Sequence, residues 1–212
     1  MSTYTQQEEL DKLKAWWKNY GNSLVAGVLL GLVLLVGYRY WNDYREQQRV
    51  AASALYEELL AHVRGKKSEA ANEVGRRLRQ EHAATPYAGQ AALLLARQAL
   101  DVGDSAAARS QLQWAMNQAA DPAVAHVARL RLARLLTNEG RHEPALALLE
   151  AKDMGGYASE YLEAKGDLLL ALHRREEARA AYREALKALP AGSAYQAALQ
   201  MKLDDLGAEK AP

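Results

Sequence analysis

The 212-residue sequence contains no cysteine and no phenylalanine. The lack of cysteine excludes disulfides, thiolate nucleophiles and thiolate metal sites. Valine and isoleucine are also scarce beyond residue 41, whereas Ala, Leu, Arg and Glu are abundant, and this composition favours helix over sheet. A formal net charge of +1 leaves no basic surplus of the kind that binds nucleic acid, so we expect no nucleic-acid partner.

Charge is missing altogether between Lys18 and Arg39. As an α-helix this stretch would be roughly 30 Å long, which matches the hydrocarbon core of a bilayer. A cleaved signal peptide and a buried core helix are the two alternatives. A usual signal core is shorter and a core helix needs no aromatic flanks, which this stretch has at both ends: Trp16, Trp17, Tyr20, Tyr38, Tyr40, Trp41 and Tyr44. We therefore expect an uncleaved transmembrane signal-anchor over residues 19–41 that lies in the lipid bilayer.

The orientation of this anchor is not decided by charge. Three lysines precede the span and three arginines follow it, so the positive-inside count is a tie. A short tail without a cleavable signal favours a cytoplasmic N-terminus. Residues 1–18 have an amphipathic pattern, which fits either a helix in the headgroup layer or a plain cytoplasmic flank. Within the span, Gly27 and Gly31 have the spacing that lets two membrane helices approach closely.

Residues 42–206 follow a pattern of helix, short turn and helix, with apolar residues spaced near 3.6 and no strand alternation. We expect one all-α domain here, and a disordered tail over 207–212. The turns are marked by Gly, Pro or Asp at positions where a helix would begin or end: Gly65, Thr85-Pro86, Gly103-Asp104, Asp121-Pro122, Gly140, Gly155-Gly156 and Pro190-Ala191-Gly192.

The helix pairs repeat. Ala108, Ala145 and Ala178 recur 37 and then 33 residues apart, close to the ~34-residue period of the tetratricopeptide repeat. In the last unit Gly166 and Tyr182 occupy the small and large positions that let paired helices interlock. The pattern predicts a tetratricopeptide-like solenoid, with a generic helical bundle as the alternative. Residues 193–205 would form a capping helix with one face packed on the last repeat (Tyr195, Leu199, Leu203) and the other in solvent (Gln200, Lys202, Asp204).

The concave face of such a solenoid is lined by the first helix of each pair. In this register its residues change from basic to acidic along the chain, which would orient a peptide or a partner helix. The alternative is that these charges only solvate an exposed surface. The predicted face consists of Gln90, Leu93, Arg97, Leu100, Val127, Leu130, Arg134, Asn138, Glu160, Glu163, Asp167 and Leu170.

Motifs for catalysis are missing. The five histidines share no helix-face spacing with carboxylates, and there is neither a Gly-rich phosphate loop nor a Gly-x-Ser-x-Gly turn. We therefore expect no enzyme, no metal and no cofactor.

The whole chain resembles the YfgM family, the ancillary subunit of the bacterial SecYEG translocon. The similarity rests on Trp17, on residues 26–28 inside the span, on Tyr-Arg-Tyr-Trp-Asn at 38–42, on residues 130–134 and on the ending at 201–206. The resemblance implies an inner-membrane protein with a cytoplasmic N-terminus and a periplasmic repeat domain. It also implies partnership with SecYEG and with the periplasmic chaperone PpiD, and contact with unfolded exported proteins.

Three functions compete at this point. The leading hypothesis is a membrane-tethered interaction module at the Sec translocon that helps to pass exported proteins to periplasmic chaperones. The second is a homo-oligomeric scaffold of an envelope complex, paired through Gly27 and Gly31. The third is a membrane-bound regulator whose repeat domain lies in the cytoplasm.

Overall fold

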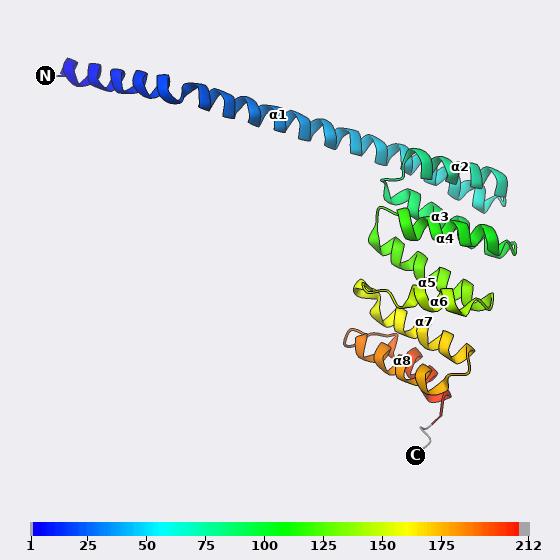
Figure 1. The fold of residues 1–212 in the computed structure, drawn as a ribbon. Coiled ribbons are helices and arrows are strands. Elements are labelled where there is room, and N and C mark those ends of the chain that lie inside the picture. The colour runs from blue at the N-terminus through cyan, green and yellow to red at the C-terminus, as the bar shows by residue number, and fades with distance from the viewer. Residues whose placement is uncertain (1, 208–212) are drawn as a thin grey trace. The chain divides into compact units, whose positions relative to one another are not determined.

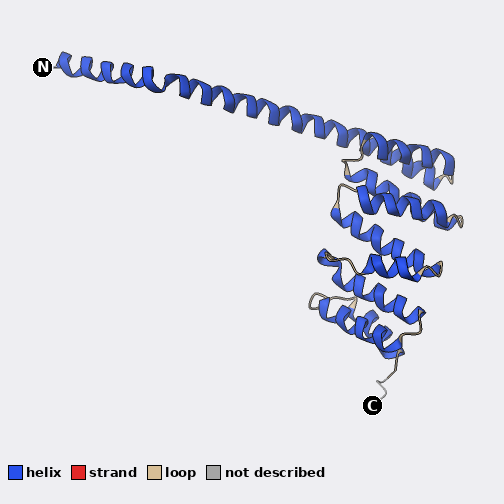
Figure 2. Ribbon diagram, in the orientation of Figure 1, coloured by secondary structure: helices blue, strands red, loops and turns tan. Residues whose placement is uncertain are grey.

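The structure, a computed structural model, describes residues 2–207, except for the side chains of residues 2–9, 11, 13, 15, 23, 24 and 28. Within residues 2–207 every regular element is a helix (Figures 1 and 2). This confirms the all-α prediction. The tail over 208–212 and most side chains of the predicted amphipathic flank lie outside the described residues. The helices are α1 (Ser2–Arg64), α2 (Ser68–Glu81), α3 (Pro86–Asp101), α4 (Ser105–Gln118), α5 (Pro122–Asn138), α6 (His142–Leu149), the 3-10 turn η1 (Gly155–Tyr157), α7 (Ala158–Ala171), α8 (Arg175–Ala188) and α9 (Gln196–Asp205).

The chain forms two units, residues 1–50 and residues 51–212. Helix α1 extends through residue 42, where the sequence predicted that the membrane anchor ends and the repeat domain begins. No proline and no helix-ending glycine motif lies in this stretch, so the backbone has no local reason to stop. The compact unit begins at Ala51, and Ala52, Leu55 and Leu59 are its first buried residues.

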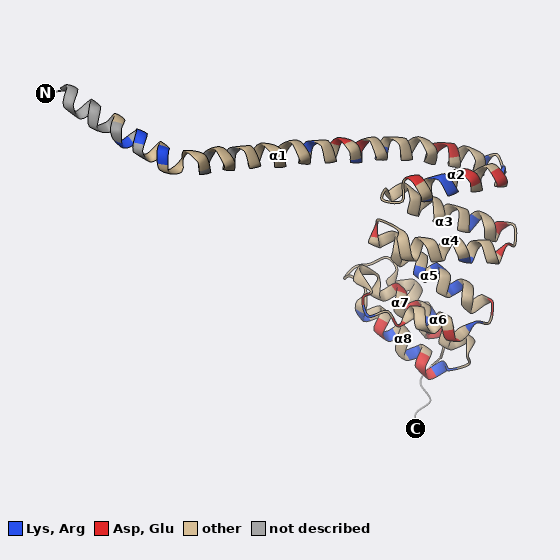
Figure 3. Cartoon of the chain, turned by 45° about the horizontal axis from the view of Figure 1, so that its top comes forward, with Lys and Arg blue, Asp and Glu red and all other residues tan. Residues whose placement is uncertain are grey.

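Among the residues of the first unit whose side chains the structure describes, the large apolar side chains are exposed. A part of α1 is long and apolar enough to cross a membrane, with a mean hydropathy of 1.9 over its most apolar 18-residue window, of which only 7% is buried. A core helix of a soluble domain would be mostly buried. The stretch is visible as an uninterrupted run without charged residues in Figure 3.

The second unit is built from helix pairs that pack in chain order, α3 on α4, α4 on α5, α5 on α6 and α7 on α8. Three buried clusters run through it, one from α1 to α3, one from α3 to α7 and one from α7 to α9. The alanines that set the repeat register, Ala108, Ala145 and Ala178, are all fully buried. The register deduced from the sequence is therefore the register of the packing.

The turns between paired helices share one backbone conformation. Gly103, Gly140 and His173 have φ of +80°, +73° and +61°, in the left-handed region. At each turn the following N–H bonds to the carbonyl five residues earlier, as in Asp104 to Ala99 at 2.8 Å, which is the Schellman arrangement. Glycine adopts this conformation without cost. His173 carries a Cβ and therefore adopts it at a cost in free energy.

Gly166 and Tyr182 interlock as the sequence predicted. A Cβ built on Gly166 would lie 2.5 Å from Cε1 of the Tyr182 ring. The Tyr182 hydroxyl donates a hydrogen bond to Asp167 at 2.7 Å, so the buried ring is fixed against α7.

The last helix, α9, caps the stack. Leu199 is fully buried and Leu203 packs on the same cluster, as predicted. The buried guanidinium of Arg179 on α8 donates hydrogen bonds to the carbonyls of Leu206 and Gly207, at 2.8 and 2.9 Å. These bonds satisfy backbone acceptors at the end of α9 and hold it in place.

Candidate protein-interaction face

The predicted concave face comes from α3, α5 and α7, the first helices of successive pairs. Most of its side chains are exposed or half-buried, as a binding surface requires. Two are buried: Leu130 is 5% exposed and Glu163 is 3% exposed. Leu130 therefore belongs to the core between helices, and Glu163 has a structural role described below. The exposed or half-buried residues are Gln90, Leu93, Arg97, Leu100, Val127, Arg134, Asn138, Glu160, Asp167 and Leu170.

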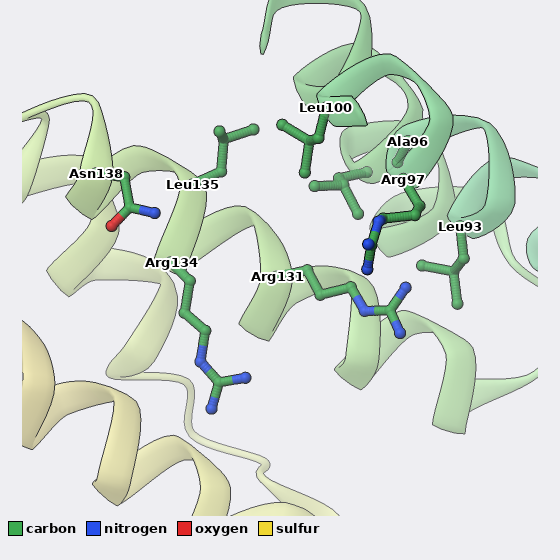
Figure 4. A pocket seen from close by; sticks show the side chains of 9 residues that line it. Leu93, Ala96, Arg97, Leu100, Arg131, Arg134, Leu135 and Asn138 are labelled. Atoms are coloured by element: carbon green, nitrogen blue, oxygen red, sulfur yellow. The ribbon is translucent and has the colours of Figure 1, made fainter. Parts of the chain in front are cut away.

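A groove of about 380 Å³ lies on this face between α3 and α5. Helix α3 contributes residues at positions i, i+3, i+4 and i+7, and α5 contributes an equivalent stripe, so that one face of each helix forms a wall. The floor includes Leu112 from α4, which is fully buried. Figure 4 shows Leu100 and Leu135 pointing toward one another across the hollow. The lining residues are Leu93, Ala96, Arg97, Leu100, Leu112, Arg131, Arg134, Leu135 and Asn138.

Five of the residues predicted for the face line this groove, namely Leu93, Arg97, Leu100, Arg134 and Asn138. The sequence analysis missed Ala96, Leu112, Arg131 and Leu135. On α5 it predicted Val127, Leu130, Arg134 and Asn138, whereas the groove uses positions 131, 134, 135 and 138. The sequence did contain a signal for the missed residues on α5. Positions 128, 132 and 136 are apolar at helical spacing, which identifies the face of α5 that packs in the core and therefore also the opposite face.

Three arginines surround the groove. Arg97 pairs with Asp101 through Nε and Oδ1 at 2.8 Å, and both side chains are exposed. Arg134 lies 3.6 Å from the carboxylate of Glu163. Arg131 makes no ion pair or hydrogen bond within residues 2–207. The groove therefore combines an apolar floor with positive charge at its edge.

Two of the three acidic residues of the predicted face, Glu163 and Asp167, are occupied by the chain itself. Glu163 accepts a hydrogen bond from the Tyr195 hydroxyl at 2.8 Å, and its carboxylate lies 2.7 Å from the Lys202 ammonium. Lys202 also bonds to both carboxylate oxygens of Asp167, at 2.7 and 2.9 Å. The expectation that Lys202 stays in solvent was wrong, because α9 turns this residue toward α7, where it neutralises two carboxylates.

These contacts shift the titration of the groups involved. Burial alone would lower the pKa of Lys202, but its hydrogen bonds to Asp167 and Glu163 outweigh burial and raise the pKa above the usual value. Burial and the bond to Glu163 raise the pKa of the Tyr195 phenol. Burial and the bond to Asp167 raise the pKa of Tyr182 well above its usual range. Glu163 and Asp167 are thus committed to internal partners, whereas half-buried Glu160 and the basic part of the face stay open.

The two glycines predicted for helix contact lie in the exposed apolar part of α1. A Cβ built on Gly27 or Gly31 would meet no atom within 4 Å. Both positions are open to another helix or to lipid. No group of three His, Asp or Glu residues that could hold a metal occurs in the described part of the chain.

An exposed apolar helix followed by stacked helix pairs with an open basic groove defines a membrane-anchored helical-repeat protein. The family model described as "Tetratricopeptide repeat-like domain" matches residues 14–208. Proteins named "Ancillary SecYEG translocon subunit" align with nearly the whole chain. The one from Neisseria gonorrhoeae is 30% identical over 95% of this chain and 97% of its own length. Those from Escherichia coli and Haemophilus influenzae are each 27% identical over 95% of this chain.

The chain belongs to the family of ancillary SecYEG translocon subunits, within the tetratricopeptide-repeat-like proteins. The resemblance deduced from the sequence is thereby confirmed.

Proposed function

We propose that this protein is a membrane-tethered interaction module that joins the Sec translocon through its apolar helix and presents its repeat domain to other proteins. The observation that supports this most directly is that one helix, α1, contains the exposed apolar stretch and also supplies buried residues to the repeat domain. A binding domain built in this way stays within reach of a membrane channel. The names of the aligned relatives support the Sec translocon as that channel.

We further propose that the N-terminus is cytoplasmic, that the repeat domain is periplasmic, and that it takes part in passing exported chains to the chaperone network, with PpiD as its chaperone partner. The repeat domain supports a binding role, because its open groove combines apolar contact area with charge. This arrangement suits recognition of a protein segment.

Copurification of the full chain from membranes in a mild detergent tests the proposal. We expect SecY and a periplasmic chaperone to copurify. The matched control replaces residues 19–41 by an unrelated transmembrane helix of equal length, which keeps the tether and should lose SecY if α1 makes the contact. Absence of both SecY and a chaperone from the native sample would contradict the proposal.

Topology is tested separately with protease added outside spheroplasts. Digestion of the chain beyond residue 45 is the expected outcome. Protection of the repeat domain until the inner membrane is opened would place it in the cytoplasm and favour the membrane-bound regulator instead.

A homo-oligomeric scaffold is the second candidate, favoured by the open surface at Gly27 and Gly31. Close helix contact through these glycines would be blocked by larger side chains. If the scaffold is correct, Gly27→Leu combined with Gly31→Leu should abolish crosslinked homodimers in membranes. If the translocon module is correct, copurification of SecY should survive this change.

A further inference from the structure

The groove between α3 and α5 has a composition that selects a particular kind of occupant. Its floor is apolar, formed by Ala96, Leu112 and Leu135. Its edge holds the guanidinium groups of Arg97, Arg131 and Arg134, and no carboxylate lines it. Figure 4 shows Arg97 and Arg131 projecting toward the same side of the hollow.

The positive charge is only partly balanced within the domain. Asp101 is the partner of Arg97, and this pair is exposed, so a stronger partner can replace it at little cost. The carboxylate near Arg134 is Glu163, which is already bonded to Lys202 and Tyr195. Arg131 has no acidic partner in the described residues. Arg97 thus has one carboxylate partner of its own, and Arg134 shares Glu163 with Lys202 and Tyr195.

Guanidinium groups bind carboxylates through two parallel hydrogen bonds and discriminate by geometry as well as by charge. A phosphate group would satisfy the arginines but would leave the apolar floor exposed. A protein segment with aliphatic and acidic residues satisfies both parts. The stripes at i, i+3, i+4 and i+7 on α3 and α5 are those of a groove that accepts a helix.

We propose that this groove binds an amphipathic segment of a partner protein in which an aliphatic side chain is flanked by Asp or Glu residues. The aliphatic side chain enters the hollow over Leu112 while the flanking carboxylates pair with Arg97 and Arg131. The proposal rests on the proposed function, since it names the chemistry of the segment that the interaction module recognises.

Photocrosslinking in membranes tests it with the full chain. A photoreactive amino acid at Asn138, an exposed residue at the edge of the groove, captures the occupant, and mass spectrometry identifies the captured segments. We expect segments with net negative charge that contain Leu, Val, Ile or Met. Capture of lipid or nucleic acid, capture of segments without acidic residues, or no capture at all would overturn the proposal.

Charge reversal supplies the second arm. Arg97→Glu combined with Arg131→Glu should reduce capture about tenfold, since two exposed ion pairs become repulsive contacts. Replacing both arginines by Lys retains the positive charge but loses the paired hydrogen bonds of a guanidinium, and should give an intermediate yield of capture. The matched control Lys187→Glu changes an exposed charge on α8 and should leave capture unchanged. Equal loss in the control and in the groove variant would refute a specific role for the groove.

Salt dependence keeps the proposal falsifiable if the reversed variant does not fold. Capture by the native sequence should fall steeply between about 0.05 and 0.5 M salt, because exposed ion pairs are screened. An unchanged yield would overturn the acidic occupant. Copurification of SecY is followed in parallel. SecY binding without acidic captures refutes this inference alone, and acidic captures without SecY refute the translocon assignment alone.

Discussion

The contact between Gly166 and Tyr182 offers the sharpest test of how the repeats are held together. In Gly166→Ala the new Cβ would lie 2.5 Å from the Tyr182 ring, where a normal contact is about 3.5–4.0 Å. The ring cannot move aside easily, because it is buried and its hydroxyl is bonded to Asp167.

Two effects of opposite sign decide the outcome. Alanine is favoured over glycine in a helix interior by about 1 kcal/mol. Overpacking of a buried site costs about 1–3 kcal/mol, and a rigid, tethered ring puts this case in the upper half of that range. The expected net loss in the free energy of unfolding is about 1–2 kcal/mol, which corresponds to a decrease of about 2–8 °C in Tm for a domain of this size.

Gly75→Ala is the matched control. Its Cβ would meet Cδ1 of Leu95, which is also buried but is an aliphatic side chain without the hydrogen bond that holds the Tyr182 ring. The gain in helix propensity is the same, so this variant should be destabilised less than Gly166→Ala. Both are compared by urea denaturation of the full chain in detergent, followed by far-ultraviolet circular dichroism.

A double-mutant cycle identifies the cause. In a Tyr182→Leu background the ring is absent, and Gly166→Ala should become neutral or stabilising by up to about 1 kcal/mol. Equal effects in both backgrounds would refute the steric explanation. A stabilising effect in the native background would refute it as well.

Two further predictions follow from turn geometry and from α9. His173→Gly should raise the free energy of unfolding by up to about 1 kcal/mol, because φ of +61° is unfavourable for a residue with a Cβ. The control Ala171→Gly, in the preceding helix, should lower the free energy of unfolding. Stabilities in the reverse order would contradict the turn argument. Pairing with Asp167 and Glu163 raises the pKa of Lys202 above its ordinary value of 10.5, so its stabilisation is complete below pH 10.5 and is lost as pH rises through the higher value of the folded state. Urea denaturation above pH 10.5 should therefore show a steeper loss for the native chain than for Lys202→Met, and equal slopes would contradict the role of the pair.

Much of the fold was predictable because its signals are local. Proline at the start of α3 and α5 and glycine after α3 and α5 mark helix ends through constraints on single residues. The position of the apolar stretch also follows from the sequence directly. The extension of α1 through residue 42 was not predicted, since the change in composition there alters what surrounds the helix and not its backbone.

The groove was predictable only in part. Three of the four α3 residues predicted for the concave face line it, but on α5 Arg131 and Leu135 line it in place of Val127 and Leu130. Periodicity alone does not say which of two adjacent stripes meets the neighbouring helix pair. Glu163 and Lys202 form an ion pair although they lie 39 positions apart in the chain, so no local pattern predicts their contact.

The sequence by itself determined a charge-free helix of membrane length, a helical-repeat domain with its register, and the pairing of small with large residues between α7 and α8. These depend on local propensity, on hydrophobic period and on side-chain volume, which can be counted along the chain. Only the tertiary structure decided which part of the concave face is open. The docking of α9 brings Lys202 and Tyr195 against Glu163 and Asp167 and occupies these two carboxylates. The rotation of α5 places three arginines around an apolar hollow. Both results depend on packing between distant segments.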